Sequence, residues 1–117
     1  MRAKVYVAGP YTQGDTSANL HQALWTANRL LELGYAPYVP HLNFFWDLTY
    51  PQSYKVWMDL DRVWLRTCDV LYRIFGPSPG ADEEELLAQS LYIPVVRTLE
   101  ELEKWYETSQ SGDTTRE

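Results

Sequence analysis

The chain has 117 residues, a formal net charge of −6, and a composition that is 45% hydrophobic and 15% aromatic. This length suits one domain, and we expect residues 1–107 to form it and the polar residues 108–117 to be a disordered tail. The negative charge argues against duplex nucleic acid as a partner, because phosphate neutralisation requires clustered Lys and Arg. The single cysteine, Cys68, excludes an internal disulfide and a cysteine-based metal site. No stretch resembles a transmembrane helix or a signal peptide, so we expect a cytoplasmic protein that does not contact the membrane.

The first half of the chain predicts two strands separated by a helix. Residues 4–8 form an apolar run that ends at Gly9-Pro10, and a polar loop follows. The helix after this loop has an apolar stripe and ends at a glycine. The stripe consists of Leu20, Ala23, Leu24, Ala27 and Leu31. Residues 35–40 then form a short strand, and Pro37 places it at an edge because proline donates no backbone hydrogen bond to a sheet.

The second half predicts two more strands and three helices. Residues 41–51 form an aromatic loop, and a helix follows over about residues 53–67. Asp61 shares the apolar stripe of this helix with Trp57, Leu60, Trp64 and Cys68. The third strand, residues 70–75, leads through a loop into the next helix. The fourth strand, residues 93–97, precedes a final helix.

The alternation of strands and helices predicts parallel βαβ units with right-handed crossovers. We therefore expect an α/β fold, namely a flavodoxin-like three-layer sandwich with a mainly parallel sheet of four to five strands in the order 2-1-3-4. In this order the chain reverses direction between strands 1 and 3, and ligands bind in the crevice at such a switch point. The loop from Gly9 to Gly14 and the junction from Gly76 to Glu84 should line this crevice.

The junction between the third strand and the next helix carries the most informative residues. Residues 76–85 are rich in Gly, Pro and Ser, and the helix start directs backbone N–H groups toward the crevice. Glu84 shares a helix face with Leu87 and Ala88, and this face should point inward. An inward carboxylate can be a nucleophile or a general acid or base. Two such carboxylates suffice to cleave a glycosidic bond without a metal, and Glu84 and Asp61 are the two available.

One set of residues carries a resemblance to a known group of enzymes. The set comprises Gly9-Pro10, Asp61, Asp69 and the run Ser78-x-Gly80-Ala81-x-x-Glu84-x-x-x-Ala88. It resembles the nucleoside 2-deoxyribosyltransferase-like superfamily, which includes nucleoside 5′-monophosphate N-glycosidases, and looks closest to its small deoxyribosyltransferase-like domains. The resemblance spans about residues 4–103. It implies hydrolysis or transfer at the N-glycosidic bond of a nucleoside or nucleoside 5′-monophosphate, without cofactor or metal, in a homodimer or higher homo-oligomer.

The resemblance also implies roles for single side chains. Glu84 matches the catalytic glutamate that attacks the sugar C1′, and Asp61 matches the aspartate that contacts the sugar or the base. Tyr6 lies where the family has a tyrosine beside the nucleophile. The 5′ end of the ligand would be held by the loop residues Ser78, Gly80 and Ala81. The other predicted substrate contacts lie at the ends of the first two strands and are Gly9, Pro10, Tyr11 and His41.

Two alternatives to this enzyme stay open. The crevice could bind a nucleotide as a signal, in which case a ligand would bind without release of free base. A metal-dependent phosphohydrolase could instead use Asp59, Asp61 and the acids at 82–85. Helical phase disfavours this second alternative, because Asp59 and Asp61 point to different sides of their helix. A similar choice applies to three aromatic residues, which could stack on a base or form a dimer contact: Phe44, Phe45 and Trp46.

Overall fold

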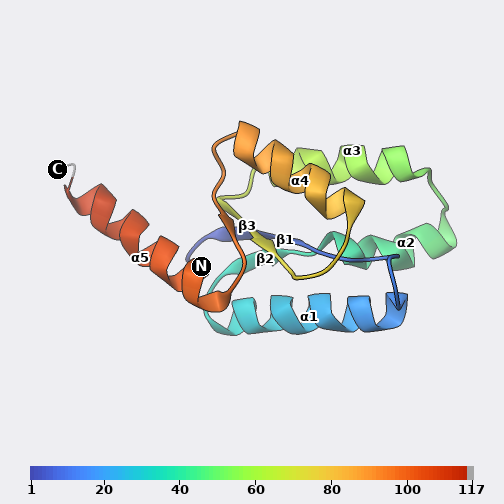
Figure 1. The fold of residues 1–117 in the computed structure, drawn as a ribbon, viewed down its shortest axis with the longest axis horizontal. Coiled ribbons are helices and arrows are strands. Elements are labelled where there is room, and N and C mark those ends of the chain that lie inside the picture. Colours follow the sequence, from blue (N-terminus) through green and yellow to red (C-terminus); the bar gives the residue numbers. More distant parts are fainter. Residues whose placement is uncertain (116–117) are drawn as a thin grey trace.

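Four apolar runs of the chain pair into one parallel sheet in a computed structural model that describes residues 1–115 (Figure 1). The strands are β1 (Lys4–Ala8), β2 (Ala36–Tyr38), β3 (Val70–Arg73) and β4 (Val95–Val96). Their order is β2-β1-β3-β4, and every neighbouring pair is parallel. The predicted α/β, flavodoxin-like arrangement is therefore confirmed. The edge position predicted for the strand that contains Pro37 is confirmed as well.

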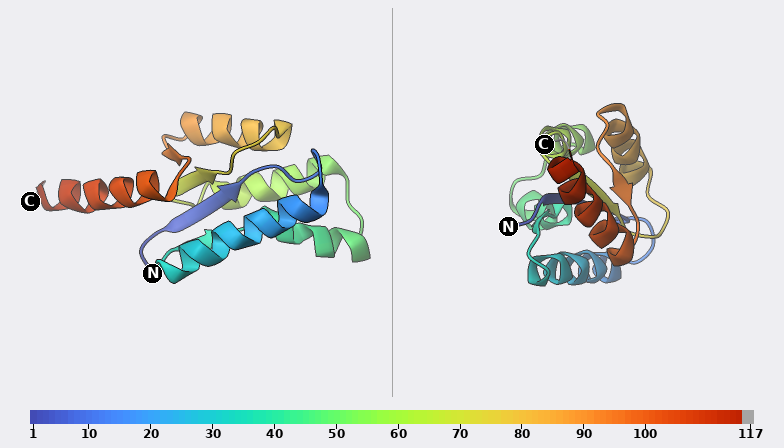
Figure 2. Two further views of the ribbon diagram at one scale, coloured as in Figure 1. Left: turned by 60° about the horizontal axis from the view of Figure 1, so that its bottom comes forward. Right: turned by 90° about the vertical axis from the view of Figure 1, so that its left-hand side faces the viewer.

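Helices cover both faces of this sheet (Figures 1 and 2). One face packs against α1 (Thr16–Glu32) and the first half of α5 (Leu99–Thr115), and the other against α3 (Tyr54–Leu65) and α4 (Pro79–Ser90). The short helices η1 (Pro40–Leu42) and α2 (Asn43–Thr49) connect β2 to α3. Figure 2 shows that α5 projects beyond the end of the sheet.

The central strand β1 divides its side chains between the two cores. Val5 and Val7 pack on the α1 side, whereas Tyr6 and Ala8 pack on the side of α3 and α4. This division follows from the strand period of two residues, because successive side chains point to opposite faces. Tyr6 is completely buried. Its position on the α4 side is what brings its hydroxyl to the predicted catalytic glutamate.

The buried stripes of α1 and α3 are rotated relative to the prediction. In α1 the buried residues are Ala23, Thr26, Ala27 and Leu30, whereas Leu24 and Leu31 are exposed. In α3 the buried residues are Met58, Asp61 and Leu65. The large indoles of α3 lie at the borders of this face, where Trp64 stacks on Tyr38. Small and flexible side chains thus fill the tight contact, and the wide rings pack beside it.

The predicted aromatic loop over 41–51 is wrong, because most of this segment is helical. Residues 40–42 form η1 and residues 43–49 form α2. The segment contains neither glycine nor proline between positions 41 and 50, so nothing in it opposes a helix. Helix α2 ends just before Pro51, as expected where a following proline disfavours helical backbone.

The last helix is longer than the sequence predicted. Helix α5 continues to Thr115, eight residues beyond 107, and so includes most of the segment expected to be a disordered tail. Residues 116 and 117 of that predicted tail lie outside the described residues. The boundary of the domain at residue 107 stays a prediction. Within residues 1–115, no helix combines the length and the apolar character needed to cross a membrane.

Candidate active site

Two loops meet at the carboxyl ends of β1 and β3, and two glycines allow this contact. A Cβ atom on Gly9 would lie 2.8 Å from the Cβ of Ile74, and one on Gly76 would lie 2.7 Å from the Cγ of Pro10. Gly76 also has a φ of +129°, which other residues rarely adopt. The two loops can therefore lie side by side only because these positions lack side chains.

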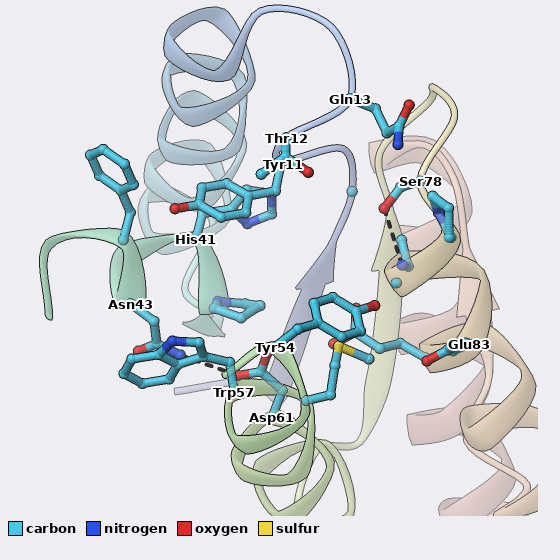
Figure 3. Close-up of a pocket in the computed structure, with 18 of the residues that line it drawn as sticks. Tyr11, Thr12, Gln13, His41, Asn43, Tyr54, Trp57, Asp61, Ser78 and Glu83 are labelled. Atoms are coloured by element: carbon cyan, nitrogen blue, oxygen red, sulfur yellow. Dashed lines mark hydrogen bonds between the residues drawn. The ribbon is translucent and has the colours of Figure 1, made fainter. Parts of the chain in front are cut away.

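A cavity of about 460 Å³ opens beside these loops, with walls from η1, α2, α3 and the start of α4 (Figure 3). This volume lies within the range of small-molecule sites. The cavity is lined by most of the predicted site residues: Gly9, Tyr11, His41, Asp61, Ser78, Gly80, Ala81 and Glu84. The other two lie behind the wall, where Tyr6 contacts Glu84 and the carbonyl of Pro10 contacts His41.

Glu84 is held at the cavity wall by α4 and by a tyrosine of the central strand. Its side chain is 6% exposed, and its Oε2 accepts a hydrogen bond from the hydroxyl of Tyr6. Burial raises the pKa of Glu84 to about 8; the bond from Tyr6 opposes this shift, and the charge of Asp61 adds to it. Burial also raises the pKa of Tyr6 well above its usual value, so the phenol keeps its proton. The pKa of this buried carboxyl thus lies near neutral pH, and the hydroxyl of Tyr6 is its fixed hydrogen-bond donor.

Asp61 faces the same cavity from α3. It is 7% exposed, and its Oδ1 lies 3.2 Å from Nδ2 of Asn43 and 3.5 Å from the hydroxyl of Tyr38. Burial raises the pKa of Asp61 to about 6, although the contact with Tyr38 opposes the shift. The structure therefore brings together the two carboxylates that the sequence selected. Figure 3 shows Asp61 on α3 and Asn43 on the adjoining wall.

His41 contributes a buried ring whose tautomer can be deduced. The imidazole is 5% exposed, and its Nε2 lies 3.0 Å from the carbonyl oxygen of Pro10. Because a carbonyl only accepts, Nε2 carries the proton and Nδ1 has a free lone pair. Nδ1 is buried and has no hydrogen-bond partner within the part of the chain that the structure describes. Burial lowers the pKa of His41, although hydrogen bonding to the carbonyls of Pro10 and Gly9 opposes this shift. The ring is therefore neutral, and its Nδ1 is a hydrogen-bond acceptor.

The start of α4 satisfies most of its own N–H groups. Ser78 is the N-cap: its Oγ accepts from the N–H of Ala81 at 3.1 Å, and its carbonyl accepts from the N–H of Asp82 at 2.9 Å. Pro79 has no N–H to offer. This leaves the N–H of Gly80 in the first turn. The hydroxyl of Tyr54 approaches the same residue and lies 3.0 Å from where a Cβ of Gly80 would be.

Several cavity residues were missed by the sequence analysis, and most of them lie on α2 and α3. Asn43 and Asp47 line one wall together with Phe44, which the sequence had offered as a residue that could stack on a base. Tyr54 and Trp57 line the next wall (Figure 3). Once α2 is known to be a helix, its three residues fall on one face. The carboxylate of Asp47 accepts from the backbone N–H of Gln52 at 2.8 Å and from the Trp57 indole at 2.7 Å, and both bonds lower the pKa of Asp47.

Other candidates lie away from the cavity. Asp59 pairs with Lys55 at 2.6 Å on the exposed side of α3, and Asp69 accepts from the backbone N–H of Lys4 at 2.8 Å. Phe45 and Trp46 are exposed and do not line the cavity. Among residues 1–115, no group of three or more His, Cys, Asp or Glu side chains is arranged to hold a metal ion.

The chain is similar to known proteins both in its fold and in its sequence. In its fold, the chain is similar to a solved 2-deoxyribosyltransferase from the psychrotolerant bacterium Bacillus psychrosaccharolyticus. The TM-score is 0.62 at 20% sequence identity, over 80% of this chain and 69% of that one. This likeness supports a deoxyribosyltransferase-like fold. The chain itself belongs to the family described as a domain of unknown function (DUF7768), which matches residues 3–98. No curated protein matches it.

Proposed function

We propose that the protein cleaves or transfers the N-glycosidic bond of a nucleoside, with Glu84 as the nucleophile. The observation that carries this proposal is the buried pair of Tyr6 and Glu84 at the wall of the cavity, with Asp61 facing the same space. The likeness of the fold to a 2-deoxyribosyltransferase supports the proposal. A homodimer or higher homo-oligomer stays a prediction.

The proposed reaction has two steps. Because the pKa of Glu84 is about 8, its carboxyl first passes its proton to Asp61, and the carboxylate then attacks C1′ while the electron pair of the glycosidic bond passes to the nitrogen of the base. Asp61, which faces the same cavity, donates that proton to a neutral leaving base. Water or a second base then attacks C1′, the bond between C1′ and Glu84 breaks, and Glu84 recovers the proton that the attacking group gives up. Tyr6 orients the carboxylate throughout, and its hydrogen bond favours the ionised form.

The remaining cavity residues suit the parts of a nucleoside. Tyr11, Phe44 and Trp57 present aromatic surface on which a flat base can stack. His41 presents the acceptor Nδ1 to a hydroxyl or an amino group. The loop residues Gly9 and Ser78 lie across from these rings and would receive the sugar.

Release of free base from a panel of nucleosides and 5′-monophosphates, measured by chromatography with and without a chelator, tests this function. We expect Glu84→Gln to lower the rate by at least about 1000-fold while circular dichroism shows a folded protein. Glu85→Gln is the matched control, because Glu85 is the next residue of α4 but does not line the cavity. It should keep the rate within about a factor of three of the wild type.

Each of the other outcomes would indicate a different nucleophile or a different function. Base release by a folded Glu84→Gln variant would overturn the assignment of the nucleophile. Saturable binding of a nucleotide without any base release by the wild type would favour the signal-binding module. Release of phosphate that stops when the chelator is added would favour the metal-dependent phosphohydrolase.

A further inference from the structure

The cavity has acidic side chains on its walls and no basic one to balance them. Four acids line it, namely Asp47, Asp61, Glu83 and Glu84, whereas its lining within residues 1–115 includes neither Lys nor Arg. Arg62 reaches its border, where it pairs with Glu83 at 3.2 Å and Asp59 at 3.4 Å. That arginine is already shared between two carboxylates, so it leaves the cavity without a free positive charge.

The backbone offers little that would offset this negative charge. A phosphate at a helix start is usually held by several N–H groups. At the start of α4, two of these groups already bond to Ser78, Pro79 has none, and Gly80 keeps one. A 5′-phosphate placed here would face the carboxyl of Glu84 and the charge of Glu83, which already holds Arg62, and it would find one backbone donor and no Lys or Arg in the described lining. The same surroundings would favour a positively charged group.

Two other features of the cavity also suit a cation. The buried Nδ1 of His41 accepts and cannot donate, because Nε2 holds the proton. Tyr11, Phe44, Tyr54 and Trp57 line the cavity, and aromatic rings attract cations. Charge, hydrogen bonding and ring surface therefore act in the same direction.

We propose that the cavity selects its ligand by charge, binding unphosphorylated nucleosides whose base is cationic at the glycosidic nitrogen and rejecting 5′-monophosphates. Pyridinium ribosides are the simplest members of this class. This inference rests on the proposed function and deepens it. When Glu84 attacks C1′, the electron pair of the broken bond neutralises the base, which leaves without receiving a proton. Water then attacks C1′ and gives up one proton to solvent, so charge and atoms balance.

Binding to the turnover-blocked variant Glu84→Gln, measured by calorimetry, separates charge from shape. Nicotinamide riboside is compared with its uncharged 1,4-dihydro form, which has nearly the same shape, and with its 5′-monophosphate. We expect the cationic riboside to bind at least about tenfold more tightly than either of the others at low salt. The difference in affinity should decrease as salt is added, because salt screens the attraction between the cationic riboside and the solvent-exposed acidic side chains.

A substitution that adds a cation should reverse part of this selectivity. Gln13 lines the cavity on the loop after β1, so Gln13→Arg should narrow the ratio between the riboside and its monophosphate by at least about fivefold. Gln89→Arg is the matched control, because it changes the net charge equally on an exposed part of α4 outside the cavity. It should leave the ratio unchanged.

The outcomes separate this inference from the function on which it rests. Equal binding of the cationic and uncharged ribosides, tighter binding of the monophosphate, or no binding of any of the three would overturn the charge selectivity. Base release from neutral nucleosides without any preference for charge would also overturn the charge selectivity, but it would support the proposed glycosidase function. Charge-ranked binding with no base release by the wild type would support the selectivity and reject the glycosidase.

Discussion

Two neighbouring glutamates of α4 lie in opposite surroundings. Glu85 contacts Arg97 and lies 3.4 Å from Arg73, so two cations share its charge. Glu84, one residue earlier, is more deeply buried, and its hydrogen bond comes from the neutral hydroxyl of Tyr6. One flank of the helix is therefore a network of ion pairs. The other flank presents a carboxyl that no cation among the described residues contacts.

This contrast separates stability from reactivity along one helix. Arg73 is 6% exposed and joins the end of β3 to the following loop, because it donates to the carbonyls of Ile74 and Gly76 and to Asp82. These bonds hold the start of α4 in place, and with it Glu84. A paired charge is tolerated in a protein interior, whereas an unpaired carboxyl has a raised pKa. The fold thus fixes the start of α4 through Arg73, which contacts Asp82 and Glu85, whereas Glu84, the proposed nucleophile, takes no part in these ion pairs.

The largest effect should come from breaking the paired flank. Arg73→Leu leaves Glu85 and two loop carbonyls without a buried donor, and we expect it to lower the free energy of unfolding by about 3–5 kcal/mol. Arg97→Leu is the control, because Arg97 is 58% exposed and should cost at most about 1 kcal/mol. Urea denaturation at pH 7 measures both. Equal, small losses would show that the network contributes little to stability.

The unpaired flank should instead make stability depend on pH. The folded protein keeps the proton of Glu84 up to about pH 8, whereas the unfolded chain loses it near 4.5. Between these values the folded state binds the extra proton, so Glu84 by itself lowers wild-type stability as pH rises, by at most about 1.4 kcal/mol per pH unit. Glu84→Gln removes this dependence and should be more stable than the wild type by about 2–4 kcal/mol at pH 9. Urea unfolding at pH 5, 7 and 9 measures the difference.

Glu85→Gln serves as the control for this experiment. Its charge is paired on the other flank, so it should show no stability gain over the wild type at high pH. A stability gap between the wild type and Glu84→Gln that stays constant from pH 5 to pH 9 would contradict the raised pKa.

The smallest effect should come from removing the hydrogen bond between Tyr6 and Glu84. Tyr6→Phe removes the hydrogen bond that favours the ionised form, so the pKa of Glu84 should rise further. We expect kcat/KM for base release to fall about tenfold at pH 7 and to recover in part at higher pH. The pH–rate profile of Tyr6→Phe should therefore shift to the alkaline side. Tyr38→Phe is the comparison, because Tyr38 contacts Asp61 instead.

Sequence patterns predicted the sheet and the inward face of α4 but not the details of helix packing. The apolar runs and the alternation of elements were enough for the order 2-1-3-4, because few parallel topologies satisfy the rules for crossovers. Glu84 and Ala88 are buried on α4, as their spacing predicted. In α1 and α3 the apolar residues cover more than one face. Which of these faces is buried therefore depends on packing against the sheet, and Leu24 and Leu31 are exposed.

The candidate site was predictable where it follows from topology and not where it depends on contacts between elements. Residues at the ends of β1 and β3 had to meet, so Gly9 and Ser78 could be placed together. Asn43 and Asp47 were missed because their segment was taken for a loop. Tyr54 was missed because nothing local indicates that a residue at the start of α3 reaches the start of α4.

The central position of β1 also determines when the site can form. Tyr6 and Glu84 are 78 residues apart, and β1 pairs with β3 only after the whole of α1, β2 and α3 has been folded or bypassed. Contacts between such distant segments close slowly, because a long loop must be ordered before they are made. In a partly folded chain, Glu84, the proposed nucleophile, therefore still lacks its contact with the hydroxyl of Tyr6. Recovery of base release after dilution from denaturant would consequently report the completion of the sheet rather than the formation of α4.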